Sequence, residues 1–410
     1  MLHSAVINVA FFADSLPCYT NIDVFRGWHV YAAAGLRRQG FNAIAVNLSN
    51  CNEVIVDNVD GVPLIRVPLD IGKVSLVRRL NSIIRKMLGY DLELNNASLT
   101  YGDFLDFLVN SIENPILYLH GYHRRTEAWI VMRRIMRRRI PMILQNHASK
   151  PPFNLHGRNI VRRSIWYRRE NGLRRIPGFF FALSEFEKRY LESLGVRHVM
   201  VRTMPTDFNL IKPLNESVKR EIRNRHNMRE DTIYITMYSG GIERGIHYVP
   251  IISEALRRRF GSSVELMVMG SPPRLVEWLR GRGVMAFQRL PYKDYLEVVN
   301  ASDLFIMPAR SETKYGGIMV SVMEAMAAGI PVVSPTLIHF PDIRQVNRLG
   351  SLTRFVDSVN DLKSFIDEVI HVIENLESFN PWLIHELGKR HYSWEAFTAD
   401  FKSAVSRLGT

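Results

Sequence analysis

The sequence is short of several features that would place it in well-defined classes of protein. Its 410 residues include two cysteines, Cys18 and Cys51, which are too few for the disulfide framework of a small secreted domain and fit a reducing compartment. No apolar run reaches the roughly 18 residues that a membrane-spanning helix needs. Residues Met1–Asp14 lack the basic start and the small-residue cleavage site of a signal peptide, and we interpret them as a strand. We therefore expect a cytoplasmic protein.

Acidic residues are outnumbered by basic ones, and the imbalance is concentrated in one segment. The chain has 53 Lys or Arg against 40 Asp or Glu, which gives a formal net charge of +13. Between His120 and Phe180, fifteen Lys or Arg accompany only two acids, so this window carries the whole excess. The arginines of residues 124–175 alternate with apolar residues, as in helices that lie on an anionic membrane and as in ordinary packed helices with exposed arginines. Nucleic acid fits less well, because no zinc-finger or helix–turn–helix signature accompanies the charge.

Internal repeats and low-complexity segments are also missing, and 47% hydrophobic with 23% charged residues is typical of a folded protein. Short apolar strands alternate with helical stretches twice along the chain, which predicts an α/β fold with two parallel sheets. The expected strands of the first sheet are Val6–Phe12, Ala43–Val46, Ile116–His120, Pro141–Gln145 and Phe179–Leu183. Those of the second are Ile233–Tyr238, Val264–Met269, Val284–Phe287, Leu304–Met307 and Pro331–Val333.

Two successive sets of this kind predict two facing Rossmann-like domains with a cleft between them. We place an N-terminal, acceptor-side domain at residues 1–205 and a C-terminal domain at residues 206–380. A last helix in residues 381–410 is expected to pack back toward the N-terminal domain. Ligands of such sheets bind at the carboxyl ends of the strands.

The segment after the strand Leu304–Met307 contains a glycine pair and then a helix, expected over Ile318–Ala328. Gly316 and Gly317 stand where that helix should begin, so their backbone N–H groups and the helix dipole suit an anion such as a diphosphate. Glu324 follows inside the helix, where its carboxylate would accept hydrogen bonds from ribose hydroxyls. On spacing alone, a glycine turn followed by a solvated glutamate is the more ordinary interpretation.

This segment resembles the retaining GT-B glycosyltransferases of family 4, the glycosyl transferases group 1. The family's Glu-Ala-Met-Ala and Gly-x-Pro-Val-Val are matched by residues 324–327 and 329–333. Further segments resemble the family in the right order: Ala182–Lys188, Pro205–Pro213, Gly283–Phe287, Ala301–Leu304 and Arg390–Trp394. The resemblance implies a GT-B fold, a nucleotide-sugar donor as co-substrate, no cofactor and no metal. The absence of any Asp-x-Asp agrees with a metal-free site.

The resemblance also implies a diphosphate site after the strand Ile233–Tyr238. Arg244 stands where the family has a lysine, and a guanidinium suits a phosphate bidentately. The family's preceding arginine is absent, and Gly240 and Gly241 are expected to offer backbone N–H groups instead. The family's other glutamate is absent too, because its position is occupied by Gly316. Glu312 lies four residues earlier and is the expected substitute.

In the N-terminal half, Gly27 begins a segment that resembles the family's first glycine loop and helix. His147 follows the strand Pro141–Gln145, where the family often carries a histidine that hydrogen-bonds the transferred sugar. His120 and His123 flank a similar strand end. A metal site there is not indicated, because no third ligand follows at a recognisable spacing. Any of these histidines is equally explained as a structural residue.

These observations predict a glycosyltransferase that moves a sugar to a glycan, lipid or small-molecule acceptor, with retention of configuration. His147, Arg244 and Glu312 are the candidate catalytic residues. The donor-binding candidates are Gly27, Gly240, Gly241, Arg244, Gly316, Gly317 and Glu324. The enzyme is expected in the cytoplasm, with the inner face of a membrane as an alternative location. The main alternative function is a non-catalytic nucleotide-sugar or carbohydrate-binding relative, which the missing glutamate favours.

Overall fold

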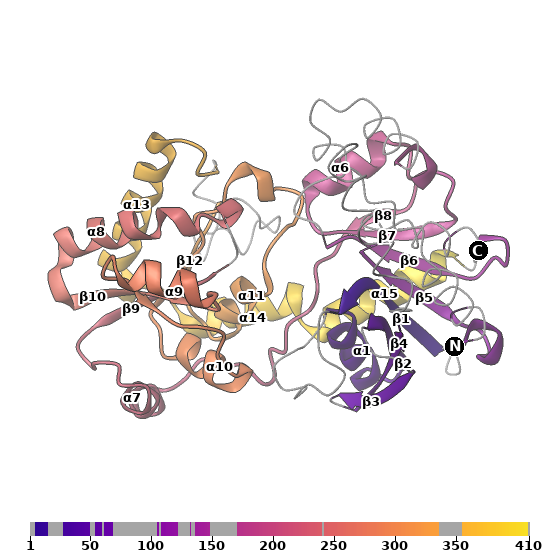
Figure 1. The fold of residues 1–410 in the computed structure, drawn as a ribbon, viewed down its shortest axis with the longest axis horizontal. Coiled ribbons are helices and arrows are strands. Elements are labelled where there is room, and N and C mark those ends of the chain that lie inside the picture. Colours follow the sequence, from indigo (N-terminus) through magenta and orange to yellow (C-terminus); the bar gives the residue numbers. More distant parts are fainter. Residues whose placement is uncertain are drawn as a thin grey trace. The chain divides into compact units, whose positions relative to one another are not determined.

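The computed structural model describes residues 5–14, 28–49, 54–59, 61–68, 105, 108–121, 132, 136–147, 170–239, 242–335 and 355–408. The chain divides into two compact units (Figure 1). Unit 1 comprises Met1–Met204 together with Phe397–Thr410, and unit 2 comprises Pro205–Ala396. Among the described residues, no helix is long and apolar enough to cross a membrane.

Unit 1 is built on an eight-stranded sheet with the order β3-β4-β2-β1-β5-β6-β7-β8. All neighbouring strands run parallel except β3, which pairs antiparallel with β4 at one edge. The strands are β1 (Ala5–Asp14), β2 (Asn42–Ser49), β3 (Ile55–Val59), β4 (Val62–Pro68), β5 (Ile116–His120), β6 (Met142–Gln145), β7 (Gly178–Ala182) and β8 (Val199–Val201).

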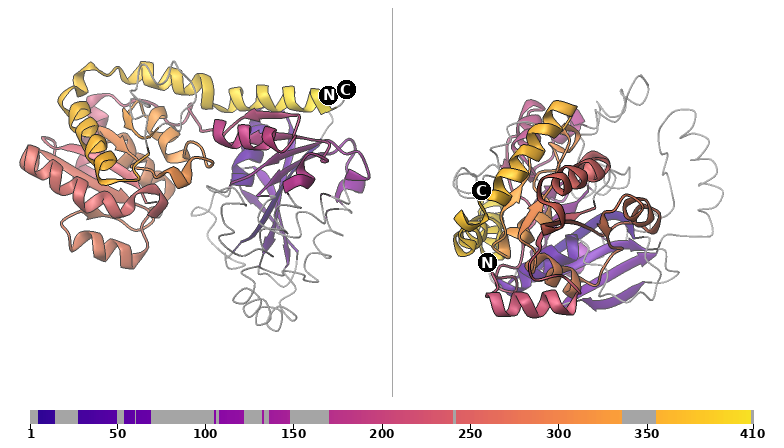
Figure 2. Two further views of the ribbon diagram at one scale, coloured as in Figure 1. Left: turned by 90° about the horizontal axis from the view of Figure 1, so that it is seen from above. Right: turned by 90° about the vertical axis from the view of Figure 1, so that its left-hand side faces the viewer.

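Three helices of unit 1 are described over their full length: α1 (Trp28–Arg38), α6 (Glu185–Ser193) and α15 (Trp394–Leu408). Because side chains alternate across a strand, β5 directs Leu117 and Leu119 to one face and Tyr118 to the other. The leucines join the apolar core that also receives Leu191 of α6. The Tyr118 ring meets the α15 ring of Phe401 at 5.7 Å between centroids. The last helix of the chain therefore covers one face of the N-terminal sheet, as the left view of Figure 2 shows.

Unit 2 contains a five-stranded, all-parallel sheet with the order β11-β10-β9-β12-β13. Its strands are β9 (Ile233–Tyr238), β10 (Val264–Met269), β11 (Met285–Ala286), β12 (Leu304–Ile306) and β13 (Val332–Val333). Its α-helices are α7 (Glu216–Arg225), α8 (Val249–Phe260), α9 (Pro273–Arg280), α10 (Tyr292–Asn300), α11 (Val320–Ala327), α13 (Val359–Glu374) and α14 (Pro381–Tyr392). Short 3-10 turns are η3 (Ile242–Arg244), η4 (Ile246–Tyr248), η5 (Gly261–Ser263), η6 (Ser311–Thr313) and η7 (Leu376–Ser378).

The two faces of the unit 2 sheet are covered by different helices. Alternate residues of β9, such as Ile235 and Met237, point into a core shared with α8, α9 and α13. Residues of opposite parity, such as Tyr234, Met267 and Phe305, face a second core with α10, α11 and α14. Both faces of this sheet are therefore buried, and only its ends remain for a ligand.

Each strand expected in the sequence is present, and the α/β, Rossmann-like prediction is confirmed. Several strand and helix ends differ by one to three residues, which is the usual uncertainty at element boundaries. The sequence analysis missed β3, β4 and β8, and it did not anticipate the antiparallel edge. The chain passes from unit 1 to unit 2 after Met204, and it returns at Phe397, within the last helix.

Candidate functional site

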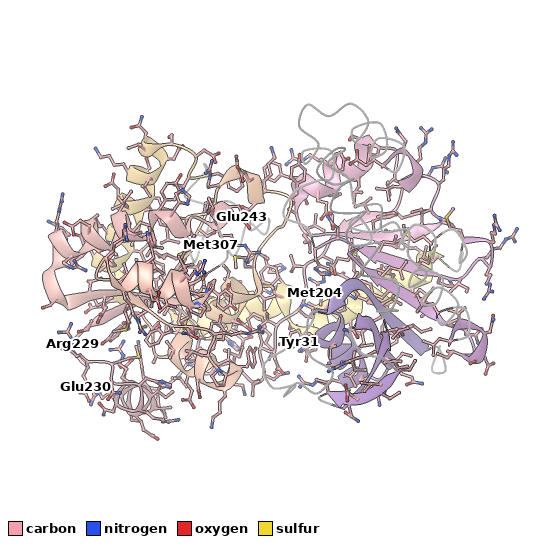
Figure 3. The ribbon with its side chains drawn as sticks, in the orientation of Figure 1. Tyr31, Met204, Arg229, Glu230, Glu243 and Met307 are labelled. Carbon is pink, nitrogen blue, oxygen red and sulfur yellow. The ribbon has the colours of Figure 1, made fainter. Side chains whose placement is uncertain are left out.

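At the carboxyl end of the unit 2 sheet, the loops that follow β9 and β12 are in close backbone contact and share a hydrogen bond. Gly245 has a φ of +82°, and a Cβ atom added there would lie 2.1 Å from the carbonyl oxygen of Pro308. The backbone N–H of Arg310 also donates to the carbonyl of Glu243, with 2.9 Å between N and O. Glu243 and Met307 mark these two loops in Figure 3. Only glycine meets both demands at position 245, the left-handed backbone and the close approach.

Arg244 lies between these two contacts, in η3. Its side chain is partly buried. Burial lowers the pKa of the guanidinium, while the Glu243 carboxylate and Tyr238 raise it. Arginine stays protonated in proteins, so the loop holds a fixed positive charge with little water around it. Such a charge interacts more strongly with an anion than a fully hydrated one does.

A second cationic group follows β12. The Arg310 guanidinium lies 3.8 Å from an Asp357 carboxylate oxygen and 3.9 Å from Glu312. The carboxylate of Asp357 also accepts the backbone N–H of Ser311 at 3.0 Å. The pKa of His247 is lowered by burial first and by the Arg310 charge second, while a hydrogen bond to the Ile242 backbone raises it. Burial and the Arg310 charge thus favour the neutral form of the His247 imidazole.

Glu324 is a buried residue in α11, and two tyrosines hold its carboxylate. The Tyr292 hydroxyl donates to Oε1 at 2.9 Å, and the Tyr295 hydroxyl donates to Oε2 at 2.8 Å. Only 4% of Glu324 is exposed, so it is not the solvated glutamate of the simpler interpretation. The Tyr295 pKa is raised by burial and then by the Glu324 charge, which keeps this hydroxyl a donor. The Tyr238 ring packs edge-on against Tyr295 at 5.6 Å between centroids.

The glycine pair lies ahead of α11 and not at its first turn, because the helix begins at Val320. The N–H of Gly316 donates to the Thr313 carbonyl at 2.8 Å, so it is engaged in a turn. Gly317 has a φ of +62°. The side-chain oxygen of Ser321, in the first turn of α11, is buried and has no hydrogen-bond partner among the described residues. The first turn of α11 thus lies a few residues further along the chain than the glycine pair.

Glu312, the expected substitute for the missing glutamate, lies in η6. Its side chain is 43% exposed, and an oxygen lies 3.9 Å from the Arg310 guanidinium. Glu312 belongs to the same loop as Arg310. This loop lies at the carboxyl end of the sheet, as do Arg244 and Glu324.

In unit 1, His147 follows β6 and is partly exposed. Its Nε2 lies 2.9 Å from Nδ1 of His120, a fully buried residue at the end of β5. The planes of the two rings differ by 17°, with 5.2 Å between centroids. The sequence analysis weighed these histidines separately and did not anticipate their pairing, which follows from the parallel neighbours β5 and β6.

Three predicted donor residues, Gly27, Gly240 and Gly241, lie outside the described residues. The same holds for most of the Arg-rich segment 124–175, of which residues 132, 136–147 and 170–175 are described.

The two sheets with these helix layers define the GT-B fold. Residues 235–375, which contain the unit 2 site, match the profile of a protein family described as "Glycosyl transferases group 1". No curated protein matches the sequence.

Solved structures resemble the chain over nearly its full length at low sequence identity. One is HepE of Anabaena in complex with UDP and glucose, with 14% identity, a TM-score of 0.63 and coverage of 99% of this chain and 100% of that chain. Another is the N-terminal domain of Candida albicans trehalose-6-phosphate phosphatase, with 13% identity, a TM-score of 0.67 and coverage of 99% and 97%. A third is an α,α-trehalose-phosphate synthase (UDP-forming) from Burkholderia vietnamiensis, with 9% identity, a TM-score of 0.61 and coverage of 98% and 99%. At these identities the likeness establishes the fold.

Proposed function

We propose that this protein is a nucleotide-sugar-dependent glycosyltransferase whose donor diphosphate binds at the carboxyl end of the unit 2 sheet. The family match of residues 235–375 and the solved neighbours that contain UDP or a UDP-sugar support this proposal. The observation that carries it is the fixed position of Arg244, between the Gly245–Pro308 contact and the Glu243–Arg310 hydrogen bond. A rigid, partly dehydrated cation there suits the charge that develops on a departing diphosphate.

Arg244 would stabilise the leaving diphosphate without a metal. Its planar guanidinium offers two parallel N–H donors to phosphate oxygens. The first turn of α11, with the buried Ser321 hydroxyl, would supply further donors to the same anion. The sugar would be transferred with retention of configuration, with the departing phosphate taking the proton of the acceptor on the same face.

Glu324 would bind the ribose of the nucleotide. Each of the two tyrosine hydroxyls donates to a different oxygen of its carboxylate. Tyr292 and Tyr295 would thereby orient the carboxylate before the nucleotide arrives, which lowers the entropic cost of binding. In unit 1, His147 would contact the transferred sugar. The acceptor would be a glycan, a lipid or a small molecule, and the Arg-rich segment 124–175 would favour one carried on an anionic membrane.

The test is a screen of nucleotide sugars by thermal shift and by slow donor hydrolysis. We expect one donor to stabilise the wild type and to be hydrolysed. Arg244→Gln should weaken donor affinity about tenfold to a hundredfold, and Arg244→Lys should recover part of the loss, because a charge-assisted hydrogen bond contributes about 1.5–3 kcal/mol. The matched control is Arg258→Gln on α8, where the arginine is 79% exposed and pairs with Glu254. If Arg244→Gln and Arg258→Gln change the donor affinity equally, the donor does not bind at the carboxyl end of the unit 2 sheet.

A second candidate, a non-catalytic nucleotide-sugar-binding protein, is favoured by one specific observation. Position 316 is a glycine whose N–H is engaged in a turn, and Glu312 is exposed beside Arg310. The same screen separates the two functions. A donor that binds in an Arg244-dependent way but is never hydrolysed or transferred, even with lipid and glycan acceptors present, supports the binding protein.

A further inference from the structure

A row of hydrogen bonds crosses neighbouring strands of unit 1. The strands β2, β1 and β5 are adjacent in the sheet and each contributes one residue to the row, and His147 follows the next strand, β6. The Asn8 side-chain amide donates to the Ile44 carbonyl at 3.3 Å. Asn8 Oδ1 lies 3.5 Å from Nε2 of His120, and Nδ1 of His120 lies 2.9 Å from Nε2 of His147. The row begins inside the sheet and reaches the partly exposed imidazole of His147.

The chemistry at the buried end fixes the direction of every bond in the row. A backbone carbonyl such as that of Ile44 can only accept, so the NH₂ group of Asn8 must face it. The Asn8 oxygen then faces His120 and can only accept, so Nε2 of His120 carries a proton. In a neutral imidazole the other nitrogen is then an acceptor, and Nδ1 of His120 receives a hydrogen bond from Nε2–H of His147.

Burial makes this direction costly to reverse. Asn8 and His120 are both 0% exposed. The Tyr118 ring lies against His120, with 4.1 Å between ring centroids. A flipped Asn8 amide would bring its oxygen to the Ile44 carbonyl and its NH₂ to a protonated nitrogen, which leaves buried groups unsatisfied. An imidazolium in place of neutral His120 would lose solvation with no carboxylate beside it in the row.

We propose that His120 is a positioning residue that holds His147 in the tautomer with its proton on Nε2, so that Nδ1 of His147 is the acceptor. An acceptor atom selects for a ligand group that donates a hydrogen bond, such as a sugar hydroxyl, and against a phosphate or carboxylate oxygen. This inference rests on the proposed function for the identity of the ligand. The row of hydrogen bonds itself is independent of that function.

The decisive measurement is the tautomer of His147 in the wild type. Histidine-selective ¹⁵N labelling and long-range ¹H–¹⁵N correlation spectra, recorded at about pH 8 where free histidine is neutral, distinguish the two ring nitrogens. The signal is assigned by its loss in His147→Gln. We expect His147 to carry its proton on Nε2. A proton on Nδ1 in the wild type overturns the proposal, whatever the enzyme does.

Two pairs of variants test the positioning role. His120→Phe keeps the ring and removes the acceptor, whereas His120→Asn keeps an oxygen near the place of Nδ1. Asn8→Leu removes the acceptor that faces Nε2 of His120, whereas Asn8→Asp places a carboxylate there, and both serve if His120→Phe does not fold. We expect His120→Phe and Asn8→Leu to give mixed His147 tautomers and a donor turnover about tenfold to a hundredfold lower, and His120→Asn to retain most of both. Asn8→Asp should favour a His120 imidazolium, whose Nδ1–H would donate to His147 and move the His147 proton to Nδ1. Wild-type tautomers and turnover in the Phe and Leu variants would overturn the proposal.

Failure of the proposed function gives a different pattern. If no nucleotide sugar binds, the turnover comparison is lost, but the wild-type spectrum and the tautomers of the four variants still decide whether the row orients His147. If a donor is bound and hydrolysed while His147 carries its proton on Nδ1, the glycosyltransferase stands and the positioning role is wrong.

Discussion

Glu187 is a carboxylic acid that unit 1 keeps away from water. It lies in the first turn of α6, where Oε2 accepts the backbone N–H of Leu183 at 2.7 Å. Burial raises its pKa to about 8, against the lowering effect of hydrogen bonds from Leu183 and from the Asn146 side chain. Asn146, which hydrogen-bonds to Glu187, directly precedes His147 in the sequence.

The stability of unit 1 should therefore fall as pH rises. The unfolded Glu187 ionises near its ordinary value, while the folded one keeps its proton up to about 8. Between these values the folded state binds one more proton, so this group's contribution to the free energy of unfolding decreases by up to about 1.4 kcal/mol per pH unit. Denaturant titrations at several pH values in this range give the free energy of unfolding as a function of pH. This free energy should fall less steeply with pH for Glu187→Gln than for the wild type. Equal slopes would show that Glu187 is ionised in the folded protein.

Tyr292 and Tyr295 are expected to affect nucleotide affinity through their hydrogen bonds to Glu324. Removing either hydroxyl takes one donor from a buried carboxylate, a hydrogen bond to a charged group worth about 1.5–3 kcal/mol. Tyr292→Phe and Tyr295→Phe should thus lower both the melting temperature and the affinity for the donor found in the screen. Tyr248→Phe is the matched control, because its hydroxyl donates to the Val356 carbonyl and not to Glu324. Donor affinity that is unchanged in both Glu324-linked variants would separate Glu324 from the nucleotide.

The turn that carries Arg244 depends on a single glycine. Gly245→Ala would face both a φ of +82° and a contact of 2.1 Å with the Pro308 carbonyl. Gly40→Ala, after the end of α1, is the matched control, because its φ is +86° but nothing lies within 4 Å of the added Cβ. We expect Gly40→Ala to cost about 1 kcal/mol, the penalty of a left-handed alanine, and Gly245→Ala to cost clearly more and to weaken donor binding. Thermal melts and donor titrations of the two variants give the comparison, and equal effects would mean that the loops can separate.

The parallel strands were predictable because each is a short apolar run between helical patterns, as at Ile116–His120 and Ile233–Tyr238. The hairpin of β3 and β4 was missed, although Asp60-Gly61 between two apolar stretches is a known hairpin signal. Gly61 indeed has a φ of +78°. The turn signal of two residues was weaker than the strand–helix alternation, which predicted a purely parallel sheet.

The candidate site was predictable in its location and not in its contacts. That the loops after the strands gather at the carboxyl end of the sheet follows from the parallel direction of the strands. The resemblance to the family supplied Arg244 and Glu324. The tyrosine hydroxyls that bind Glu324 come from α10, 32 and 29 residues earlier in the sequence. No periodic pattern in a sequence shows which side chains of two packed helices will meet. The Gly245–Pro308 contact and the row from Asn8 to His147 likewise join distant segments.

At the scale of the whole molecule, the chain crosses between the units twice, and α15 completes the packing of unit 1. Phe397 and Phe401 are both 0% exposed. Their rings contact Tyr118 at 6.2 and 5.7 Å between centroids. Truncating a buried phenylalanine to alanine costs about 3–5 kcal/mol.

A fragment of residues 1–204 should consequently be less stable than unit 1 of the intact protein, and a peptide of residues 394–410 should restore it. Limited proteolysis and circular dichroism with and without the peptide give the measurement. The same peptide with Phe397 and Phe401 changed to alanine is the control and should have no effect. A fragment that resists protease equally well without the peptide would show that the β-sheet of unit 1 needs no cover from α15.

The double crossing has a further consequence for how the protein is made. A ribosome builds the chain from its N-terminus, and domains usually fold in that order as they emerge. Here the helix that covers the first sheet is translated after all of unit 2. Unit 2 can complete its packing during synthesis. Unit 1 completes its packing only when the final residues of α15 are made, and until then one apolar face of its sheet is not covered by this helix. The N-terminal half is therefore the last part of the nascent chain to mature, and the interval before α15 emerges is when a chaperone that binds exposed aromatic surface has its substrate.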